Sequence, residues 1–238
     1  MEVSSTEIQN NFGTYLKFAQ VEDVYITRNG KRIAVLQYQK DTSEGCAETK
    51  ADYRGGKLRM SAEEFRKFAE ASENRYELID GEVFQLASSS YKHQRVIGEI
   101  FSQIHQWSKN KECKPITAPF DVILFKDDME SIVQPDIVVI CDSEKVNDQG
   151  RYQGIPTVIF EVLSDSTRNK DMLKKLNLYM AGGIGEYWIV NLWNHEVYIY
   201  TFTSGEISDY RVFKGMECAD SEVLKDLSIP LERIFTVE

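Results

Sequence analysis

Residues 156–167 read PTVIFEVLSDST, an apolar run with one acidic residue, Glu161, near its centre. A strand that is apolar on both faces is usually buried in a sheet covered by helices. An unpaired carboxylate inside such a strand costs on the order of 2–7 kcal/mol or more. The run therefore predicts a buried strand of an α/β sheet, in which Glu161 needs a partner or a chemical role.

A second acidic residue stands at the start of another apolar run. In VQPDIVVIC, Pro135 confines its position to a strand start or a sheet edge, and Asp136 follows it directly. Two carboxylates that enter adjacent buried strands repel each other, and each raises the pKa of the other. A hard divalent cation removes this conflict, since Mg²⁺ favours one or two carboxylates together with waters and phosphate oxygens.

A helix is predicted over about residues 170–181, after the strand that holds the glutamate. Asp171, Lys175 and Tyr179 are spaced i, i+4, i+8, so they share one helix face. Over the strand ends, Lys175 would hold a water and stabilise negative charge on a phosphate, with Asp171 orienting it. Two carboxylates and a lysine in this order suggest metal-assisted phosphodiester hydrolysis with water as the nucleophile.

The composition of the chain limits its class. The 238 residues are 42% hydrophobic and 28% charged, values typical of one or two soluble globular domains. The net charge of −10 argues against a broad basic surface for passive nucleic-acid binding, but it does not exclude a nuclease with an acidic metal centre. No apolar run approaches the roughly 18 residues of a membrane helix, and the N-terminus lacks the features of a signal peptide.

The cysteines are widely scattered, at Cys46, Cys113, Cys141 and Cys218. There is no CxxC motif, and the chain has only three histidines. Neither a zinc site nor a disulfide framework is indicated, and a reducing cytoplasm is the expected compartment.

The chain divides into three segments by its pattern. In the first, Ser4 and Glu7 fit a capping box that opens a helix, and Asn29-Gly30 between two β-rich runs predicts a hairpin. The second is polar and lacks periodicity, as linkers do. The third alternates helical and strand patterns. The segments are residues 1–38, 39–57 and 58–238.

The third segment predicts an α/β fold, a mixed sheet flanked by helices with added β-hairpins. A helix runs to about Ala71, and a hairpin turns at Gly81. Further helices are expected at 91–109 and 170–181, the latter ending at Gly182-Gly183. Strands are expected at about 116–125, 132–141, 157–163 and 186–190, with two more β-runs separated by Gly205.

The third segment also resembles the PD-(D/E)xK nuclease superfamily and, more closely, the Uma-type restriction endonuclease family. The resemblance rests on RYELIDGEV, the helix start YKHQ, APFDVIL, VQPDIVVICD, EVLSDSTRNKD and GEYWIV, and on Lys175 with Tyr179. It implies a restriction-endonuclease-like αβββαβ core. It also implies that the catalytic lysine has moved to the helix, because Leu163 stands two positions after Glu161.

The resemblance implies roles for individual residues. Asp136 and Glu161 are the implied ligands of Mg²⁺, with Mn²⁺ as a substitute, and Lys175 is the implied catalytic lysine. Glu77 is the implied auxiliary acid. Auxiliary positions are also assigned to His93, which would touch phosphate or donate a proton, and to Asp171 and Tyr179 on the helix face.

The first segment carries a separate resemblance. VSSTEIQNNFG and DVYITRNGKRIAVL resemble the Phd/YefM type II antitoxin family. This implies a small α+β domain that forms a homodimer and binds operator DNA, with a toxin protein as a further partner. The nuclease-like segment stands where that family has its toxin-binding tail. Arg28, Lys31 and Arg32 at the predicted turn are then candidates for phosphate contacts.

Each assignment has an ordinary alternative. Taken alone, Glu161 also fits a core carboxylate paired with Lys or Arg, and Lys175 alone fits a solvated helix residue. Glu77 could be a surface residue of the hairpin, and His93 a structural residue at the helix start. The three cations at the hairpin turn could be ordinary solvated charges. For the whole chain, we weigh a Mg²⁺-dependent DNA endonuclease joined to an antitoxin-type domain against a non-catalytic antitoxin or regulator. A carbohydrate- or protein-binding β-rich domain is a third alternative, which the acidic pair and the lysine disfavour.

Overall fold

The computed structural model describes all residues except 11, 20, 38–57, 149, 164–169 and 237–238. The predicted linker and the SDST turn at 164–167 lie outside the described residues. The rest forms two compact units, Met1–Leu86 and Ala87–Glu238. Among the described residues, no helix is both long enough and apolar enough to cross a membrane.

The first unit opens with a three-stranded sheet in the order β1-β2-β3. β1 pairs parallel with β2, and β2 pairs antiparallel with β3. Asn29 and Gly30 both have positive φ, as the predicted Asn-Gly hairpin requires. Ser4 Oγ accepts the backbone N–H of Glu7 at 3.1 Å, so the predicted helix start is confirmed. The elements are β1 (Glu2–Ser4), α1 (Ser5–Asn10), α2 (Phe12–Phe18), β2 (Val24–Arg28) and β3 (Lys31–Leu36).

An aromatic cluster joins this sheet region to the rest of the first unit. Phe68 packs against Phe18 and Tyr76, with 4.6 Å between ring centroids in both pairs. Ser61 and Glu64 form the predicted capping box at the start of the helix that carries Phe68. The boundary between a 1–38 domain and a domain from 58 onward stays a prediction. The remaining elements are α3 (Ala62–Ala71), β4 (Tyr76–Ile79) and β5 (Glu82–Gln85).

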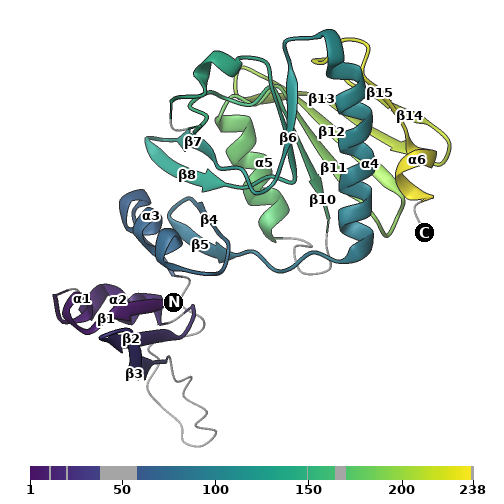
Figure 1. Ribbon diagram of the computed structural model, residues 1–238. Helices are drawn as coiled ribbons and strands as arrows, with labels where there is room; N and C mark the ends of the chain where they lie inside the picture. The colour runs from purple at the N-terminus through teal and green to yellow at the C-terminus, as the bar shows by residue number, and fades with distance from the viewer. Residues whose placement is uncertain (11, 20, 38–57, 149, 164–169, 237–238) are drawn as a thin grey trace, which may run out of the picture. The chain divides into compact units, whose positions relative to one another are not determined.

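The second unit is built on a six-stranded sheet in the order β13-β12-β11-β10-β9-β6 (Figure 1). β10 and β11 run parallel, and the other neighbours run antiparallel, so the predicted mixed sheet is confirmed. β7 and β8 pair antiparallel outside the six-stranded sheet, and β14 and β15 also pair antiparallel. The strands are β6 (Lys114–Thr117), β7 (Val122–Lys126), β8 (Met129–Val133), β9 (Ile137–Ile140), β10 (Val158–Val162), β11 (Glu186–Asn191), β12 (Glu196–Thr203), β13 (Glu206–Lys214), β14 (Cys218–Asp220) and β15 (Ser228–Pro230).

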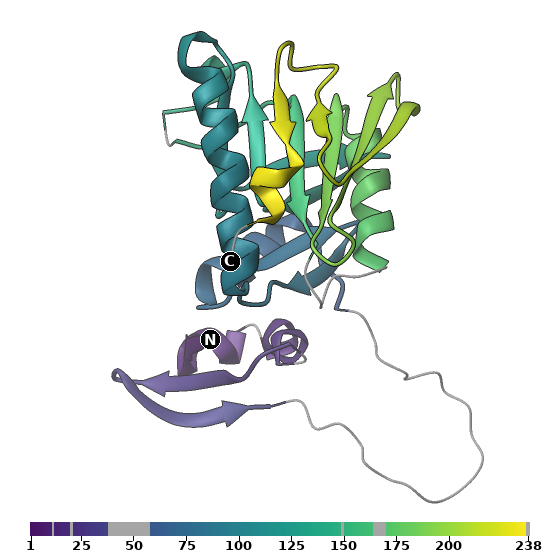
Figure 2. The same cartoon turned by 90° about the vertical axis from the view of Figure 1, so that its right-hand side faces the viewer.

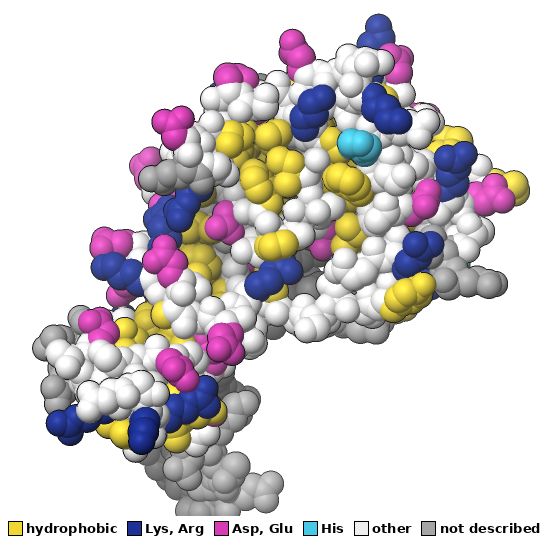
Figure 3. Space-filling model, viewed as in Figure 1, with side chains coloured by type: hydrophobic (Ala, Val, Ile, Leu, Met, Phe, Trp, Pro, Cys, Tyr) yellow, Lys and Arg dark blue, Asp and Glu magenta, His cyan; other side chains and the backbone are white. Residues whose placement is uncertain are grey.

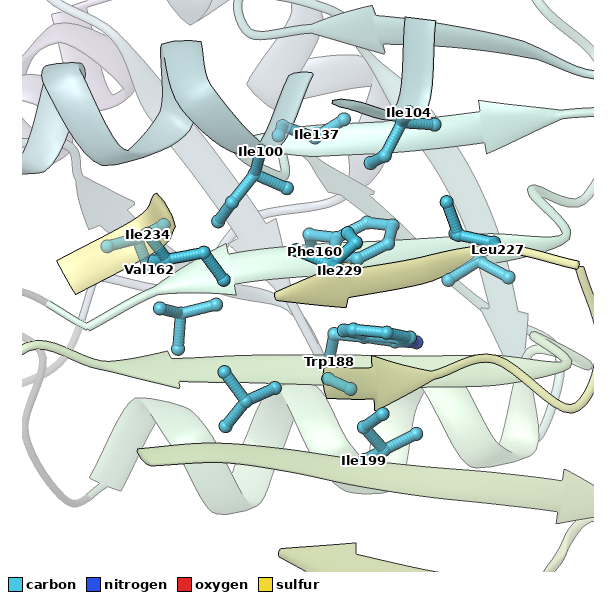
Figure 4. Packing of buried hydrophobic residues seen from close by; sticks show 14 of the residues in the cluster. Ile100, Ile104, Ile137, Phe160, Val162, Trp188, Ile199, Leu227, Ile229 and Ile234 are labelled. Atoms are coloured by element: carbon cyan, nitrogen blue, oxygen red, sulfur yellow. The ribbon is translucent and has the colours of Figure 1, made fainter. Parts of the chain in front are cut away.

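Helices cover the two faces of this sheet (Figure 2). On one face, Ile100 and Ile104 of α4 pack toward Phe160 of β10 and Trp188 of β11 (Figure 4). On the other face, Tyr179 of α5 meets Tyr187 edge-on, with 4.8 Å between ring centroids. Because side chains alternate along a strand, Phe160 faces the α4 side and the next residue faces α5. The helices are α4 (Tyr91–Trp107), α5 (Lys170–Ala181), α6 (Leu231–Phe235) and the short 3₁₀ turns Ser108–Asn110 and Ser143–Lys145.

Two of the predicted long strands are each divided in two. The strand expected at 116–125 is β6 and β7, because Pro119 interrupts it and proline cannot donate to a strand ladder. The strand expected at 132–141 is the end of β8 and all of β9, divided at Pro135. Asp127 and Asp128, both with positive φ, turn the chain from β7 into β8.

The cysteines also differ from the expectation. Cys113 and Cys141 form a disulfide, although 28 positions separate them in the sequence. They directly flank the pair Lys114↔Ile140 of the antiparallel β6–β9 ladder, which brings them together. The sequence contained no sign of this pair because the two strands are neighbours only in the folded sheet.

Candidate active site

Glu161 lies near the end of β10, on the sheet face that α5 covers. Its Oε1 accepts hydrogen bonds from Lys175 Nζ at 2.8 Å and from Tyr179 OH at 2.9 Å. The Lys175 and Glu161 side chains are each 13% exposed. A cation and a hydroxyl thus offset the cost of placing this carboxylate in a buried strand.

The helix delivers both partners because Lys175 and Tyr179 are one turn apart on the same face. α5 ends where the Gly182-Gly183 pair predicted, with Gly182 N–H donating to Leu178 O at 2.7 Å and Gly183 at φ +83. A side chain at position 182 would press against the backbone of Leu178 and against Leu124 of β7. Gly182 therefore allows the end of α5 to pack closely against Leu124 of β7.

Asp136 lies directly before β9, which pairs antiparallel with β10. The register pairs Phe160 with Ile137, so Glu161 and Asp136, the next residues on each side, are at the same edge of the sheet. The backbone N–H of Val162 donates to Asp136 Oδ2 at 2.8 Å. The sequence prediction that two carboxylates meet at the ends of adjacent strands is therefore matched by the geometry.

His93 reaches the same place from the first turn of α4. Its Nε2 lies 2.8 Å from Val162 O and 3.5 Å from Asp136 Oδ2. Burial lowers the pKa of His93, but the hydrogen bond and charge of Asp136, with the Val162 carbonyl, outweigh it and raise the pKa above its ordinary value. His93 Nδ1 is buried and has no hydrogen-bond partner among the described residues.

Two predicted auxiliary acids are not placed in this cluster. Asp171 lies in the first turn of α5, but its side chain is outside the described part of the structure. Glu77 is buried on β4, in the first unit, rather than on a hairpin surface. The auxiliary roles of both residues stay predictions.

The predicted DNA-contacting cations lie around the β2–β3 turn. Arg28, Lys31 and Arg32 are exposed, and basic side chains gather where this hairpin lies (Figure 3). Arg32 Nε pairs with Glu2 Oε1 at 2.6 Å, and its guanidinium lies 4.1 Å from the centroid of the Tyr25 ring. Arg32 is therefore held in place by its neighbours.

Comparison with known proteins identifies the family of this chain. A family model described as Uma2, "Putative restriction endonuclease", matches residues 62–232, well over half of the chain. The chain belongs to the Uma2 family. This agrees with the resemblance drawn from the sequence for the third segment, residues 58–238.

A solved structure supports the same fold for this Uma2 chain. It is the crystal structure of a "putative nuclease belonging to DUF820" from Anabaena variabilis. The match covers 74% of this chain and 97% of that one, with a TM-score of 0.61 and 19% sequence identity. At this identity the likeness shows the fold, a mixed α/β nuclease fold of the restriction endonuclease type. No curated protein matches the chain.

The donor set of this Uma2 chain is compatible with a divalent cation. Among the described residues, no group of three or more His, Cys, Asp or Glu side chains is arranged to hold a metal. Asp136 and Glu161 nevertheless lie at the same edge of two neighbouring strands, and Oδ1 of Asp136 makes no hydrogen bond to any described residue. Mg²⁺ needs only one or two protein carboxylates when waters and phosphate oxygens complete its shell, so the pair fits it.

A further buried acid was not among the residues predicted from the sequence. Glu186 at the start of β11 is 0% exposed and accepts hydrogen bonds from Trp188 Nε1 at 2.9 Å and Ser221 Oγ at 2.6 Å. The backbone N–H of Glu222 donates to it at 2.7 Å, and Arg211 Nη2 lies 3.4 Å away. The same signal that singled out Glu161, an acid beside an apolar strand, was present in GEYWIV.

Proposed function

We propose that this Uma2 protein is a divalent-metal-dependent DNA endonuclease with its centre at Asp136, Glu161 and Lys175. Membership of a family described as restriction endonucleases supports nuclease activity as the class. The observation that carries the proposal is that two carboxylates lie at the same edge of the sheet: Asp136 just before β9 and Glu161 near the end of β10. Lys175 Nζ lies 2.8 Å from one of these carboxylates.

The ion pair between Lys175 and Glu161 does not by itself favour catalysis, because a satisfied core carboxylate would look the same. Asp136 makes the difference. A structural role for Glu161 needs one cation, whereas a second carboxylate at the same edge of the sheet adds repulsion that one lysine cannot fully offset. A site that gathers two acids, one lysine and a buried histidine fits chemistry better than packing.

Each side chain has a distinct part in the proposed reaction. Asp136 and Glu161 would hold Mg²⁺, or Mn²⁺ in its place. The bound cation supplies Lewis-acid chemistry that polarises the phosphate and acidifies a water. The Lys175 ammonium stabilises the negative charge that develops on the phosphate. Tyr179 holds Glu161 in its orientation, and His93 holds Asp136 and the end of β10.

The proposal includes a DNA-binding and dimerisation role for the N-terminal segment, of the antitoxin type. It is supported by the exposed cations at the β2–β3 turn and by two exposed apolar side chains on β3. Ile33 is 56% exposed and Val35 is 43% exposed. β3 is an edge strand of its sheet, so these residues fit a surface that a second copy covers. A toxin protein would be a further partner.

A DNA cleavage assay tests the enzymatic part of the proposal. Supercoiled, linear and single-stranded DNA are incubated with the full chain in Mg²⁺, in Mn²⁺ and in EDTA. We expect cleavage with either metal, none in EDTA, and at least a hundredfold loss for Asp136→Asn. Asp220→Asn serves as the matched control, because Asp220 is an exposed aspartate on β14.

The outcomes separate the two candidate functions. If wild type and Asp136→Asn behave alike, or if EDTA has no effect on cleavage, the enzymatic proposal is wrong. DNA binding by the full chain without any cleavage would instead favour the non-catalytic regulator.

A further inference from the structure

The first turn of α4 is attached to the candidate active site. His93 Nε2 lies 2.8 Å from the carbonyl of Val162, so the start of α4 and the end of β10 are side by side (Figure 1). The same nitrogen lies 3.5 Å from Asp136 Oδ2. Ser90 caps this turn by accepting the backbone N–H of His93 at 3.2 Å. The position of the helix start is therefore set by contacts with the site itself.

The residues that flank His93 face the solvent. Lys92 and Arg95 are exposed, and Tyr91 is 71% exposed. Lys92 and Arg95 are spaced i, i+3, and Tyr91 and Arg95 are spaced i, i+4, so the three side chains are neighbours on the helix surface. They form what we call the α4 entry surface: Tyr91, Lys92 and Arg95.

The charge of this surface has no partner among the residues that the structure describes. Among the described residues, neither Lys92 nor Arg95 has an ion pair or a side-chain hydrogen bond, and the Tyr91 ring stacks on no other ring. The next acidic residue along α4 is Glu99, one turn beyond Arg95. The whole chain has a net charge of −10. The surface around Lys92 and Arg95, beside the candidate site, is by contrast positively charged.

The spacing suits the strand of a nucleic acid. Neighbouring Cα atoms are about 3.8 Å apart, so Lys92 and Arg95 start within one helical turn of the residue that touches Asp136. Their long side chains can span to the phosphates that flank one held at the site. Lys and Arg are common phosphate-contacting residues in such complexes, and exposed aromatic rings stack on bases.

We propose that the α4 entry surface holds the DNA strand next to the cleavage centre, with Lys92 and Arg95 on phosphates that flank the cut one and the Tyr91 ring stacked on a nucleotide. This inference rests on the proposed function, since it places the substrate strand of that same site. It assigns binding, not chemistry, to the three residues.

Binding and cleavage by the full chain test the proposal together. The variant Lys92→Ala/Arg95→Ala is compared with Lys109→Ala/Lys225→Ala, which removes two exposed cations near the other end of α4. Affinity for a labelled DNA oligonucleotide is measured in EDTA over a range of salt, and KM and kcat are measured in Mg²⁺. Each phosphate contact adds about 0.9 to the salt slope on duplex DNA, so the slope should fall by about 2.

The expected results are a roughly tenfold or greater loss of affinity near physiological salt and a raised KM, with a smaller effect on kcat. Tyr91→Ala should weaken binding by about fivefold or more, whereas Tyr91→Phe should not, because stacking needs the ring and not the hydroxyl. A DNA with a neutral methylphosphonate beside the cut position should bind wild type more weakly and leave the double variant unaffected.

The outcomes distinguish this inference from the proposed function. If wild type cleaves DNA and the double variant matches its charge control in affinity, slope and KM, the inference is wrong and the endonuclease stands. If binding depends on Lys92 and Arg95 but no metal-dependent cleavage occurs, the endonuclease fails, and with it the placement of this surface beside a cut phosphate, while DNA binding by the surface stands. A wild-type chain that binds no DNA overturns the inference outright.

Discussion

Glu161 and Glu186 are two acids in buried strands of the same sheet, and their partners set them apart. Glu186 is surrounded by backbone and neutral donors together with the Arg211 guanidinium at 3.4 Å, as expected of a structural carboxylate. Glu161 accepts from Lys175 and Tyr179 and lies on the strand that pairs with β9, directly before which stands Asp136. A buried acid is therefore informative about function only together with the charges of the neighbouring strands.

Lys175 is the residue whose removal separates catalysis from packing. We expect Lys175→Met to lower the single-turnover cleavage rate by about 10²–10⁴-fold, because the ammonium is placed to stabilise charge on the phosphate. Lys174→Met, at the adjacent position of α5, should keep the rate within a few-fold of wild type. Equal rates for the two variants would show that Lys175 has no catalytic part.

The raised pKa of His93 predicts a pH dependence of stability in metal-free protein. A raised pKa in the folded state means that protonated His93 favours folding, so this stabilisation is full below about pH 6.5 and is lost as pH rises through the folded pKa. Urea unfolding in EDTA should therefore show a larger stability difference between wild type and His93→Gln at about pH 5.5 than at about pH 8.5. A difference that does not change with pH would contradict the protonated, Asp136-bonded imidazole.

At the scale of elements, the site depends on β9, β10 and α5. The apolar run of β10 and the spacing of Lys175 and Tyr179 on α5 could be predicted from local pattern alone. That Asp136 and Glu161 stand on neighbouring strands could only be inferred, because strand order is not a local property of the sequence. The divided strands at Pro119 and Pro135 were missed because apolar patterns continue across both prolines.

Glu186 of β11 contributes to stability through its buried hydrogen bonds. It holds the segment after β14 through Ser221 Oγ and through the backbone N–H of Glu222. We expect Glu186→Ala to lower the free energy of unfolding by about 3 kcal/mol or more, because several buried donors lose their acceptor and Arg211 loses one of its carboxylate partners. The exposed Glu206→Ala on β13 should change it by less than about 0.5 kcal/mol.

Chemical denaturation of the two variants measures this difference. A Glu186→Ala protein as stable as Glu206→Ala would mean that the buried network contributes nothing net. DNA cleavage at a temperature where both variants are folded should be unaffected, since Glu186 has no contact with the candidate site in the described residues.

At the scale of the whole molecule, the chain combines a family-matched nuclease fold with an N-terminal sheet of different character. The family match begins at residue 62 and leaves the first sheet outside it. Composition and motif could divide the chain, but they could not show the contact between Phe18 and Phe68 that brings α2 against α3. Nor could they show the disulfide between Cys113 and Cys141.

The exposed apolar pair on β3 predicts how the molecule assembles. We expect the full chain to be a dimer and Ile33→Lys/Val35→Lys to be a monomer, because two lysines would place charge in an apolar contact. Light scattering after size-exclusion chromatography measures the mass of each. Met216→Lys, which changes a side chain that is 85% exposed, is the control. A monomeric wild type, or a double variant that stays dimeric, would exclude this surface.

The central claim is that Asp136 and Glu161 together hold the divalent cation of a nuclease. The most direct measurement is anomalous scattering from crystals of the full chain soaked in Mn²⁺. We predict one strong peak about 2.1 Å from a carboxylate oxygen of each residue, and none there in Asp136→Asn. A wild-type crystal at saturating Mn²⁺ with no peak between these two carboxylates would contradict the account.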